Sequence, residues 1–192
     1  MINFVTKIFI SLFFITQFSF ASYIDTDAEM AVVIDADTGK VLFEKNKDKK
    51  TYPASMTKIM TTLIVFEKLS NGTLTLDDKF LVSERAWKER EGSSMFVEID
   101  KEIRVEDLLR GIIVQSGNDA CIVIAENIAG TEEAFAQIMT NKGIEIGLTS
   151  TNFTNSTGMH DSKNYSTAHD IAKLSQYLIN KFPKYYHLFS ET

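Results

Sequence analysis

The chain has 192 residues, with 20 lysine and arginine side chains against 26 aspartate and glutamate side chains, a net charge of −6 at neutral pH. This acidic balance argues against a nucleic acid or an anionic membrane surface as a partner. The single cysteine, Cys121, excludes an internal disulfide, and its apolar neighbours predict that it packs as a small buried hydrophobe.

Residues 1–21 have the pattern of a signal peptide. Lys7 is their only charge, and Ile8–Phe20 is mostly apolar but shorter than the ~20 residues that span a bilayer. Small residues precede the predicted cleavage after Ala21. Cleavage would leave residues 22–192 as one domain, or one domain with a lobe, with a charge of 19 − 26 = −7. An uncleaved amphiphilic anchor is the alternative.

The first predicted element is a β-hairpin. Residues 30–35 and 40–45 are rich in strand-forming residues, and they flank a turn in which Gly39 can adopt a positive φ. A two-stranded hairpin is marginally stable by itself. Unless helices cover its faces and edges, its strands need partners that this chain does not contain.

Helices are predicted to follow the hairpin, because apolar residues recur at three- and four-residue spacing between recognisable start and stop residues. The predicted helices are 53–70 closed by Asn71-Gly72, 105–114, 119–129 ending at Gly130, 131–147, and 168–182 capped by Ser166-Thr167 and ended by Pro183. Residues 148–165 are predicted to form a polar loop, and residues 184–192 to have nothing to pack against. One hairpin followed by helices indicates a mixed α/β (α+β) fold.

Ser55 and Lys58 form the first candidate site. Residues three apart on a helix share a face, so Ser55 Oγ and Lys58 Nζ are expected within hydrogen-bonding reach. A serine hydroxyl needs a base to act as a nucleophile, and a lysine needs a lowered pKa to be that base. Burial among Met56, Ile59 and Met60, the helix dipole, and a second cation would each lower it. A serine in the first turn also presents its N–H as half of an oxyanion hole. The competing interpretation is a capped helix whose lysine reaches solvent.

Ser116 and Asn118 form the second candidate site. They lie two residues apart at the break between two apolar helical segments. Alternate residues of an extended turn project to the same side, so the hydroxyl and the carboxamide are predicted to enter one cleft with Ser55 and Lys58. There they could relay a proton and hold a peptide group. The competing interpretation is an N-cap for the helix that follows.

The two sites together resemble a known family. The segments PASMTKIMT (53–61) and QSGNDAC (115–121) resemble the first two motifs of the penicillin-binding D-alanyl-D-alanine carboxypeptidases, the low-molecular-mass serine-type family S11. Gly117, where class A β-lactamases have aspartate, favours the carboxypeptidases. The similarity extends from Tyr23 to the end of the chain. It implies a β-lactamase/transpeptidase-like fold, with an antiparallel sheet beside a helical region.

The resemblance also implies the chemistry. Ser55 would attack the carbonyl between the last two D-alanines of a peptidoglycan stem peptide, and Lys58 would accept its proton. Ser116 would help pass a proton to the departing D-alanine, and Asn118 would hold the peptide chain. β-Lactam antibiotics would acylate Ser55. No cofactor or metal is implied, and the protein would act in the periplasm or at the outer face of the bacterial cytoplasmic membrane.

The family's third motif, Lys-Thr-Gly or Lys-Ser-Gly, is missing from the chain. The only Lys-Thr pair is Lys50-Thr51, which is followed by Tyr52. Family spacing would put the motif, which supplies a carboxylate clamp and the second oxyanion donor, on a strand beyond Thr192. The chain therefore resembles the front part of such an enzyme, with incomplete C-terminal strands that a companion polypeptide could restore. An inactive truncated relic and a β-lactamase-like hydrolase are the alternatives.

Four further side chains carry weaker predictions. His160 either faces the cleft or is a solvent-exposed loop histidine. His160 and His169 stand nine residues apart, a spacing that fits no compact metal site. Ser93 and Ser94 are predicted to line the rim of the cleft.

Overall fold

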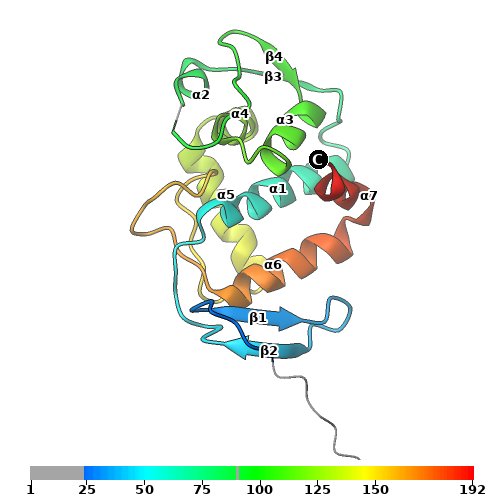
Figure 1. The fold of residues 1–192 in the computed structure, drawn as a ribbon. Coiled ribbons are helices and arrows are strands. Elements are labelled where there is room, and N and C mark those ends of the chain that lie inside the picture. The colour runs from blue at the N-terminus through cyan, green and yellow to red at the C-terminus, as the bar shows by residue number, and fades with distance from the viewer. Residues whose placement is uncertain (1–23, 90) are drawn as a thin grey trace, which may run out of the picture.

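The predicted hairpin is present at one end of the molecule. The computed structural model describes residues 24–89 and 91–192, so the signal-peptide prediction for residues 1–21 lies outside the described residues. Strands β1 (Ala31–Ile34) and β2 (Val41–Lys45) pair antiparallel, and Gly39 in the turn has a φ of +72°. Helix α6 (Ala168–Lys181) lies against β1 (Figure 1). Val33 and Leu42 remain exposed, so the hairpin is covered only in part.

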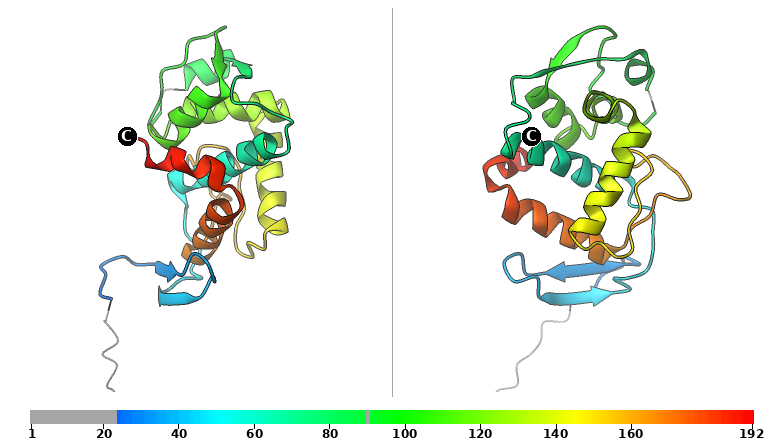
Figure 2. Two further views of the ribbon diagram at one scale, coloured as in Figure 1. Left: turned by 90° about the vertical axis from the view of Figure 1, so that its right-hand side faces the viewer. Right: turned by 180° about the vertical axis from the view of Figure 1, so that it is seen from behind.

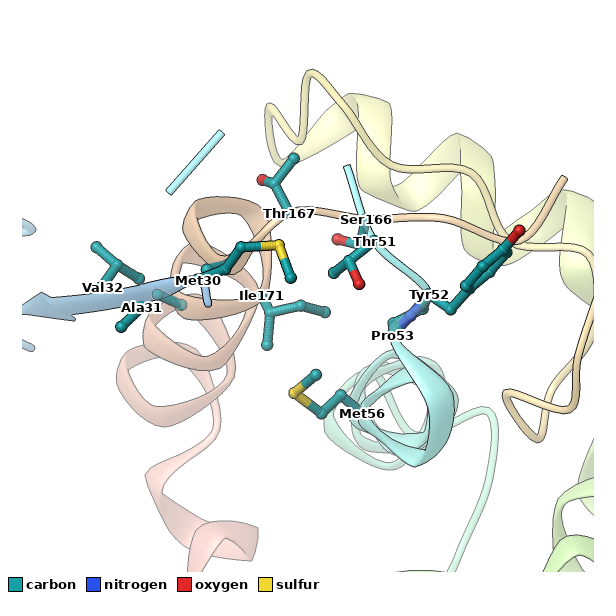
Figure 3. Close-up of a pocket in the computed structure, with 12 residues that line it drawn as sticks. Met30, Ala31, Val32, Thr51, Tyr52, Pro53, Met56, Ser166, Thr167 and Ile171 are labelled. Atoms are coloured by element: carbon teal, nitrogen blue, oxygen red, sulfur yellow. The ribbon is translucent and has the colours of Figure 1, made fainter. Parts of the chain in front are cut away.

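The first predicted helix begins with a tighter turn than expected. Residues Ala54–Thr57 form a 3₁₀ turn, and helix α1 follows as Lys58–Ser70. Because a 3₁₀ turn has three residues per turn, position 56 is rotated away from the buried face of α1. The prediction that Met56 belongs to that face is therefore wrong. Met56 is 47% exposed and points toward Met30 and Ile171 (Figure 3).

Four further helices agree with the sequence predictions to within a few residues. They are α3 (Val105–Ile113), α4 (Asn118–Ala129), α5 (Glu132–Glu145) and α6. The side chain of Thr131 caps α5 and that of Thr167 caps α6, each by accepting a hydrogen bond from a backbone N–H three residues on. Gly130, with a φ of +82°, ends α4.

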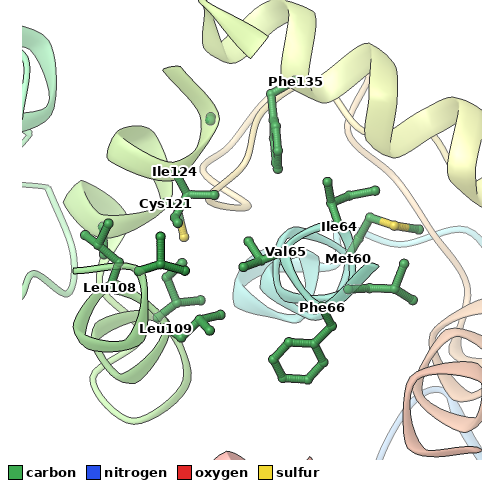
Figure 4. Close-up of a cluster of buried hydrophobic side chains, with 14 of the residues drawn as sticks. Met60, Ile64, Val65, Phe66, Leu108, Leu109, Cys121, Ile124 and Phe135 are labelled. Carbon is green, nitrogen blue, oxygen red and sulfur yellow. The ribbon is translucent and has the colours of Figure 1, made fainter. Parts of the chain in front are cut away.

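Helix α1 is the central element of the core. It lies between α3 and α4 on one side and α5 and α6 on the other (Figures 1 and 2). Large side chains from these helices are fully buried around it (Figure 4): Met60, Leu63, Val65, Phe66, Leu108, Leu109, Ile124 and Phe135. Cys121 is buried among them as a free thiol, as predicted. Burial on all sides fixes the direction in which α1 presents its first turn.

A second two-stranded sheet lies at the far end of the molecule from β1 and β2, and it was not predicted from the sequence. Strands β3 (Lys79–Leu81) and β4 (Glu102–Arg104) pair antiparallel, and a short helix α2 (Glu84–Lys88) follows β3 (Figure 1). Strands of three residues are too short to show an alternating pattern. None of the helices in the described part of the chain is both long and apolar enough to cross a bilayer.

The prediction that residues 184–192 have nothing to pack against is wrong. Pro183 ends α6 but begins another helix, α7 (Pro183–Tyr186), which continues as a 3₁₀ turn over His187–Ser190. Tyr185 and Leu188 are buried, and the Tyr185 ring packs against Phe66 of α1 at 5.3 Å between centroids. The reason is the aromatic and aliphatic spacing of this segment, which gives it an apolar face three to four residues apart.

Candidate active site

The structure places Ser55 and Lys58 in direct contact at the entrance to α1. Ser55 lies exposed in the 3₁₀ turn, and Lys58 is the first residue of α1. Lys58 Nζ lies 3.1 Å from Ser55 Oγ, with the ammonium as the donor. A neutral amine at this distance can accept the Ser55 proton instead, which is the arrangement that an activated serine requires.

The turn that carries Ser55 is held in a strained conformation. Ala54, immediately before it, has a φ of +48°, a left-handed value that is uncommon outside glycine. Gly158 of the 148–165 loop presses against this turn, since a Cβ at Gly158 would lie 1.9 Å from the Ala54 carbonyl oxygen. The Gly158 N–H donates to Asn155 Oδ1 at 2.7 Å. The loop therefore braces the backbone that presents Ser55.

Replacing Gly158 with alanine is expected to lower the free energy of unfolding by about 2–5 kcal/mol. Gly158 has a φ of +83°, so alanine there is strained, and its Cβ also collides with the Ala54 backbone. Urea denaturation monitored by circular dichroism measures the loss.

Gly72→Ala is the matched control for this substitution. Gly72 also has a positive φ, +75°, but its added Cβ would meet no heavy atom within 4 Å. The free energy of unfolding of Gly72→Ala should fall by only about 1–2 kcal/mol, the cost of a left-handed backbone conformation for alanine. Equal losses in the two variants would mean that the contact between Gly158 and Ala54 imposes no constraint.

The environment of Lys58 favours the neutral amine. Lys58 is only 5% exposed, and burial is the largest influence on its pKa, which it lowers from the ordinary 10.5. The opposing influence is Cys121, whose thiolate would raise the pKa of Lys58. Burial, however, raises the pKa of the Cys121 thiol to about 12, so the thiol is neutral at physiological pH. The predicted second cation does not contribute to the shift.

Ser116 shares a cavity with Ser55 and Lys58. It lies at the break between α3 and α4 with a left-handed φ of +55°. Ser55, Lys58 and Ser116 line a cavity of about 120 Å³, whose other lining residues are Ile59, Thr62, Ile112, Ile113 and Phe189. Ser55, Lys58 and Ser116 are thus brought to one cavity whose other walls are mostly apolar.

Asn118 lines a neighbouring cavity of about 370 Å³ that Ser55 also borders. Its side-chain nitrogen donates to the carbonyl of Glu91 at 2.8 Å and approaches Met159 Sδ at 3.4 Å. Asn118 thus ties together two walls of this cavity, the 91–93 segment and the 157–160 segment. Ser116 and Asn118 therefore border adjacent cavities rather than one, and Ser55 stands between them.

Sequence reasoning missed Asp119, which organises the rim of the Asn118 cavity. Its carboxylate is fully buried and accepts hydrogen bonds from the N–H groups of Met95, Val97 and Ala120. It also accepts one from Ser94 Oγ at 2.6 Å. Ser94 therefore holds the loop rather than lining the rim, which corrects its predicted place. An acid at the start of an otherwise apolar helix was the available signal.

Ser93 and His160 both border the Asn118 cavity. His160 is exposed as well, so both alternatives for this loop histidine hold together, and its ring lies edge-on to Tyr52 with 4.9 Å between centroids. His169 instead lies 3.2 Å from Asp48 at the surface. Among residues 24–89 and 91–192, no group of three or more His, Cys, Asp or Glu side chains is arranged to hold a metal ion.

A larger cavity, of about 420 Å³, lies elsewhere. It is bordered by β1, residues 51–53, Met56 and the start of α6 (Figure 3). Its lining is mostly apolar and contains neither Lys58 nor Ser116. The candidate residues Ser55 and Lys58 therefore border smaller cavities and not this larger one.

Comparisons with known proteins agree with this geometry. The family described as D-alanyl-D-alanine carboxypeptidase, Peptidase S11, matches residues 17–192. The chain is 44% identical over 153 residues to the D-alanyl-D-alanine carboxypeptidase DacF of Bacillus subtilis, covering 80% of this chain and 39% of that protein. It is 37% identical over 191 residues to DacC of Escherichia coli, covering 95% of this chain and 48% of that protein. The chain thus spans less than half the length of these relatives.

Solved structures show the same fold. The D-alanyl-D-alanine carboxypeptidase DacD from Francisella tularensis superposes with a TM-score of 0.85 at 39% identity, over 88% of this chain and 40% of that chain. Penicillin binding protein 5 from Haemophilus influenzae superposes with a TM-score of 0.86 at 35% identity, over 88% of this chain and 50% of that chain. The predicted mixed α/β, transpeptidase-like fold is confirmed.

Proposed function

Because the chain belongs to the D-alanyl-D-alanine carboxypeptidase family S11, we propose that it forms the nucleophile-bearing part of a serine-type carboxypeptidase. That enzyme removes the terminal D-alanine from peptidoglycan stem peptides during cell-wall synthesis and remodelling. The observation that carries the proposal is the 3.1 Å contact between Ser55 Oγ and a buried Lys58 amine whose pKa is lowered.

In the proposed acylation, the neutral Lys58 amine takes the proton from Ser55 while Oγ attacks the penultimate D-alanine carbonyl. The Ser55 N–H, in the first turn where N–H groups lack helical partners, stabilises the developing oxyanion. The proton then passes by way of Ser116 to the nitrogen of the terminal D-alanine, which leaves as the C–N bond breaks. Water hydrolyses the resulting ester and restores Ser55.

Asn118 has the proposed role of holding the peptide chain of the substrate. Its support comes from its position on the cavity that Ser55 borders and from its rigid attachment to both walls. β-Lactam antibiotics would enter as analogues of the D-Ala-D-Ala end and acylate Ser55. The proposed proton transfers use the side chains of Ser55, Lys58 and Ser116, and the proposal includes no cofactor or metal.

The carboxylate clamp and the second oxyanion donor of the family's Lys-Thr-Gly motif are absent from these 192 residues. We propose that a companion polypeptide or segment supplies them. Losing one oxyanion donor typically costs about 10²–10³ in rate, so the chain alone would acylate slowly. We further propose that residues 1–21 direct export, to the periplasm or to the outer face of the cytoplasmic membrane.

Incubation of residues 22–192 with a fluorescent penicillin, followed by intact-mass analysis over time, tests the proposal. A long-lived adduct on Ser55 supports the carboxypeptidase. An adduct that forms and disappears rapidly would indicate a β-lactamase-like hydrolase. No adduct after prolonged incubation, in protein shown to be folded by circular dichroism, would indicate an inactive relic. Release of D-alanine from a peptide ending in D-Ala-D-Ala provides the second readout.

A further inference from the structure

The cavity beside Lys58 is bordered by three separate elements. Ile59 and Thr62 come from α1, Ile112 and Ile113 from α3, and Phe189 from the 3₁₀ turn His187–Ser190. The residues from α1 and α3 belong to long helices of the core. Phe189 is different, because it comes from a short segment far along the chain and is 37% exposed on its outer side.

Phe189 is nevertheless held firmly in place. Its ring lies perpendicular to the ring of Phe66, with 6.4 Å between centroids, and 5.6 Å from that of Tyr186. Leu188, the residue before it, is buried in the core. These contacts fix one face of the ring against the molecule and leave its position little freedom.

An ion pair anchors the other end of the same segment to α3. Arg110 donates to both carboxylate oxygens of Glu191, from Nε at 2.7 Å and from a terminal nitrogen at 3.2 Å. Arg110 also contacts Glu106 at 2.9 Å. A two-bond contact of this kind sets orientation as well as distance. The turn that carries Phe189 is therefore fastened on both sides of the ring.

We propose that Phe189 is a positioning residue for the proposed acyl transfer, whose ring forms the third wall of the Lys58 cavity and keeps water from the amine. This inference rests on the proposed function of Ser55 and Lys58 and names a residue outside the two motifs. An apolar wall favours the uncharged amine, the form that accepts a proton from Ser55.

Charges on the surrounding elements do not provide an equivalent effect. The titratable group that acts on Lys58 from α4 is Cys121, which is neutral at physiological pH. Arg110 on α3 pairs with Glu191 at 2.7 Å and with Glu106 at 2.9 Å, and none of these groups contributes to the lowered pKa of Lys58. Dehydration by the cavity walls is therefore the influence on Lys58 that a change at position 189 would alter.

The experiment is a ¹³C NMR titration of residues 22–192 labelled at lysine Cε, with the Lys58 signal assigned from its loss in Lys58→Met. Phe189→Ala is expected to shift the Lys58 midpoint upward, toward the midpoints of the surface lysines, because water then reaches the amine. Phe189→Leu, which keeps an apolar wall, should leave the midpoint near that of the unsubstituted protein.

An unchanged midpoint in folded Phe189→Ala, or an equal shift in Phe189→Leu, would overturn the inference. If Phe189→Ala does not fold, Glu191→Gln replaces it. Weakening the ion pair between Arg110 and Glu191 should also raise the Lys58 midpoint. No rise in that variant would overturn the inference. If the unsubstituted chain is not labelled by penicillin but Phe189→Ala still raises the Lys58 midpoint, the proposed function is rejected and the inference about Phe189 stands. If the unsubstituted chain is labelled but Phe189→Ala leaves the Lys58 midpoint unchanged, the proposed role of Phe189 is rejected and the proposed function stands.

Discussion

Replacing Ser55 with alanine is expected to abolish acylation by penicillin, so that no labelled protein forms even after prolonged incubation. The reason is that Ser55 Oγ is the atom that forms the ester, and Lys58 cannot replace it because the amine is buried behind the serine. The measurement is the rate of fluorescent labelling under saturating penicillin, compared with the unsubstituted chain.

Ser70→Ala is the matched control for this prediction. Ser70 is the exposed last residue of α1, 15 residues after Ser55, and lines neither of the two cavities that Ser55 borders. It should label at the unsubstituted rate. Persistent labelling of Ser55→Ala at a site identified by peptide mapping would place the nucleophile elsewhere and end the case for Ser55.

Replacing Lys58 with methionine is expected to slow acylation by about 10²–10⁴, the usual contribution of a positioned general base. Methionine preserves most of the volume of the buried side chain but cannot accept a proton. In the unsubstituted chain, the acylation rate should rise with pH through the lowered pKa of Lys58 and then level off. The variant should lack this rise. Undiminished acylation in Lys58→Met would exclude the amine as the base.

The same substitution has a consequence for stability whose sign follows from proton linkage. The pKa of Lys58 in the folded protein lies below its unfolded value of 10.5, so between the two values the unfolded chain binds more protons. Stability therefore increases as pH rises through that interval, and the folded state carries the penalty of a buried charge at lower pH. Lys58→Met removes the penalty, so it should be more stable than the unsubstituted chain at neutral pH. Urea denaturation at several pH values checks this, and a constant difference between the two proteins across the interval would contradict it.

Local patterns in the sequence were sufficient to predict most of the helices and the contact between Ser55 and Lys58. The caps at Thr131 and Thr167, and the turn at Gly130, act on the backbone within three or four residues, so they can be recognised one segment at a time. The three-residue spacing of Ser55 and Lys58 is also local. Their contact at 3.1 Å follows from the geometry of a single helical turn.

Interactions between distant segments were not visible in the same way. Asp119 binds a loop that lies more than 20 residues earlier in the chain, and Gly158 braces a turn about 100 residues before it. The spacing of apolar residues along one helix or strand gives no information about such distant pairs. The three-residue strands β3 and β4 were missed for the same reason, since they are stabilised by pairing with each other and not by their own sequences.

The hairpin, the principal helices and the family could be predicted from local sequence patterns, and the four side chains of the two motifs remain predictions from the same patterns. Three features could be seen only once the chain was folded: Ser116 and Asn118 border two cavities on either side of Ser55, Met56 turns away from the core, and the segment after Pro183 packs against α1. The two groups of features differ because helix capping and helical spacing depend on residues that are neighbours in the sequence. Burial, cavity walls and the pKa of Lys58 depend instead on which remote side chains exclude water.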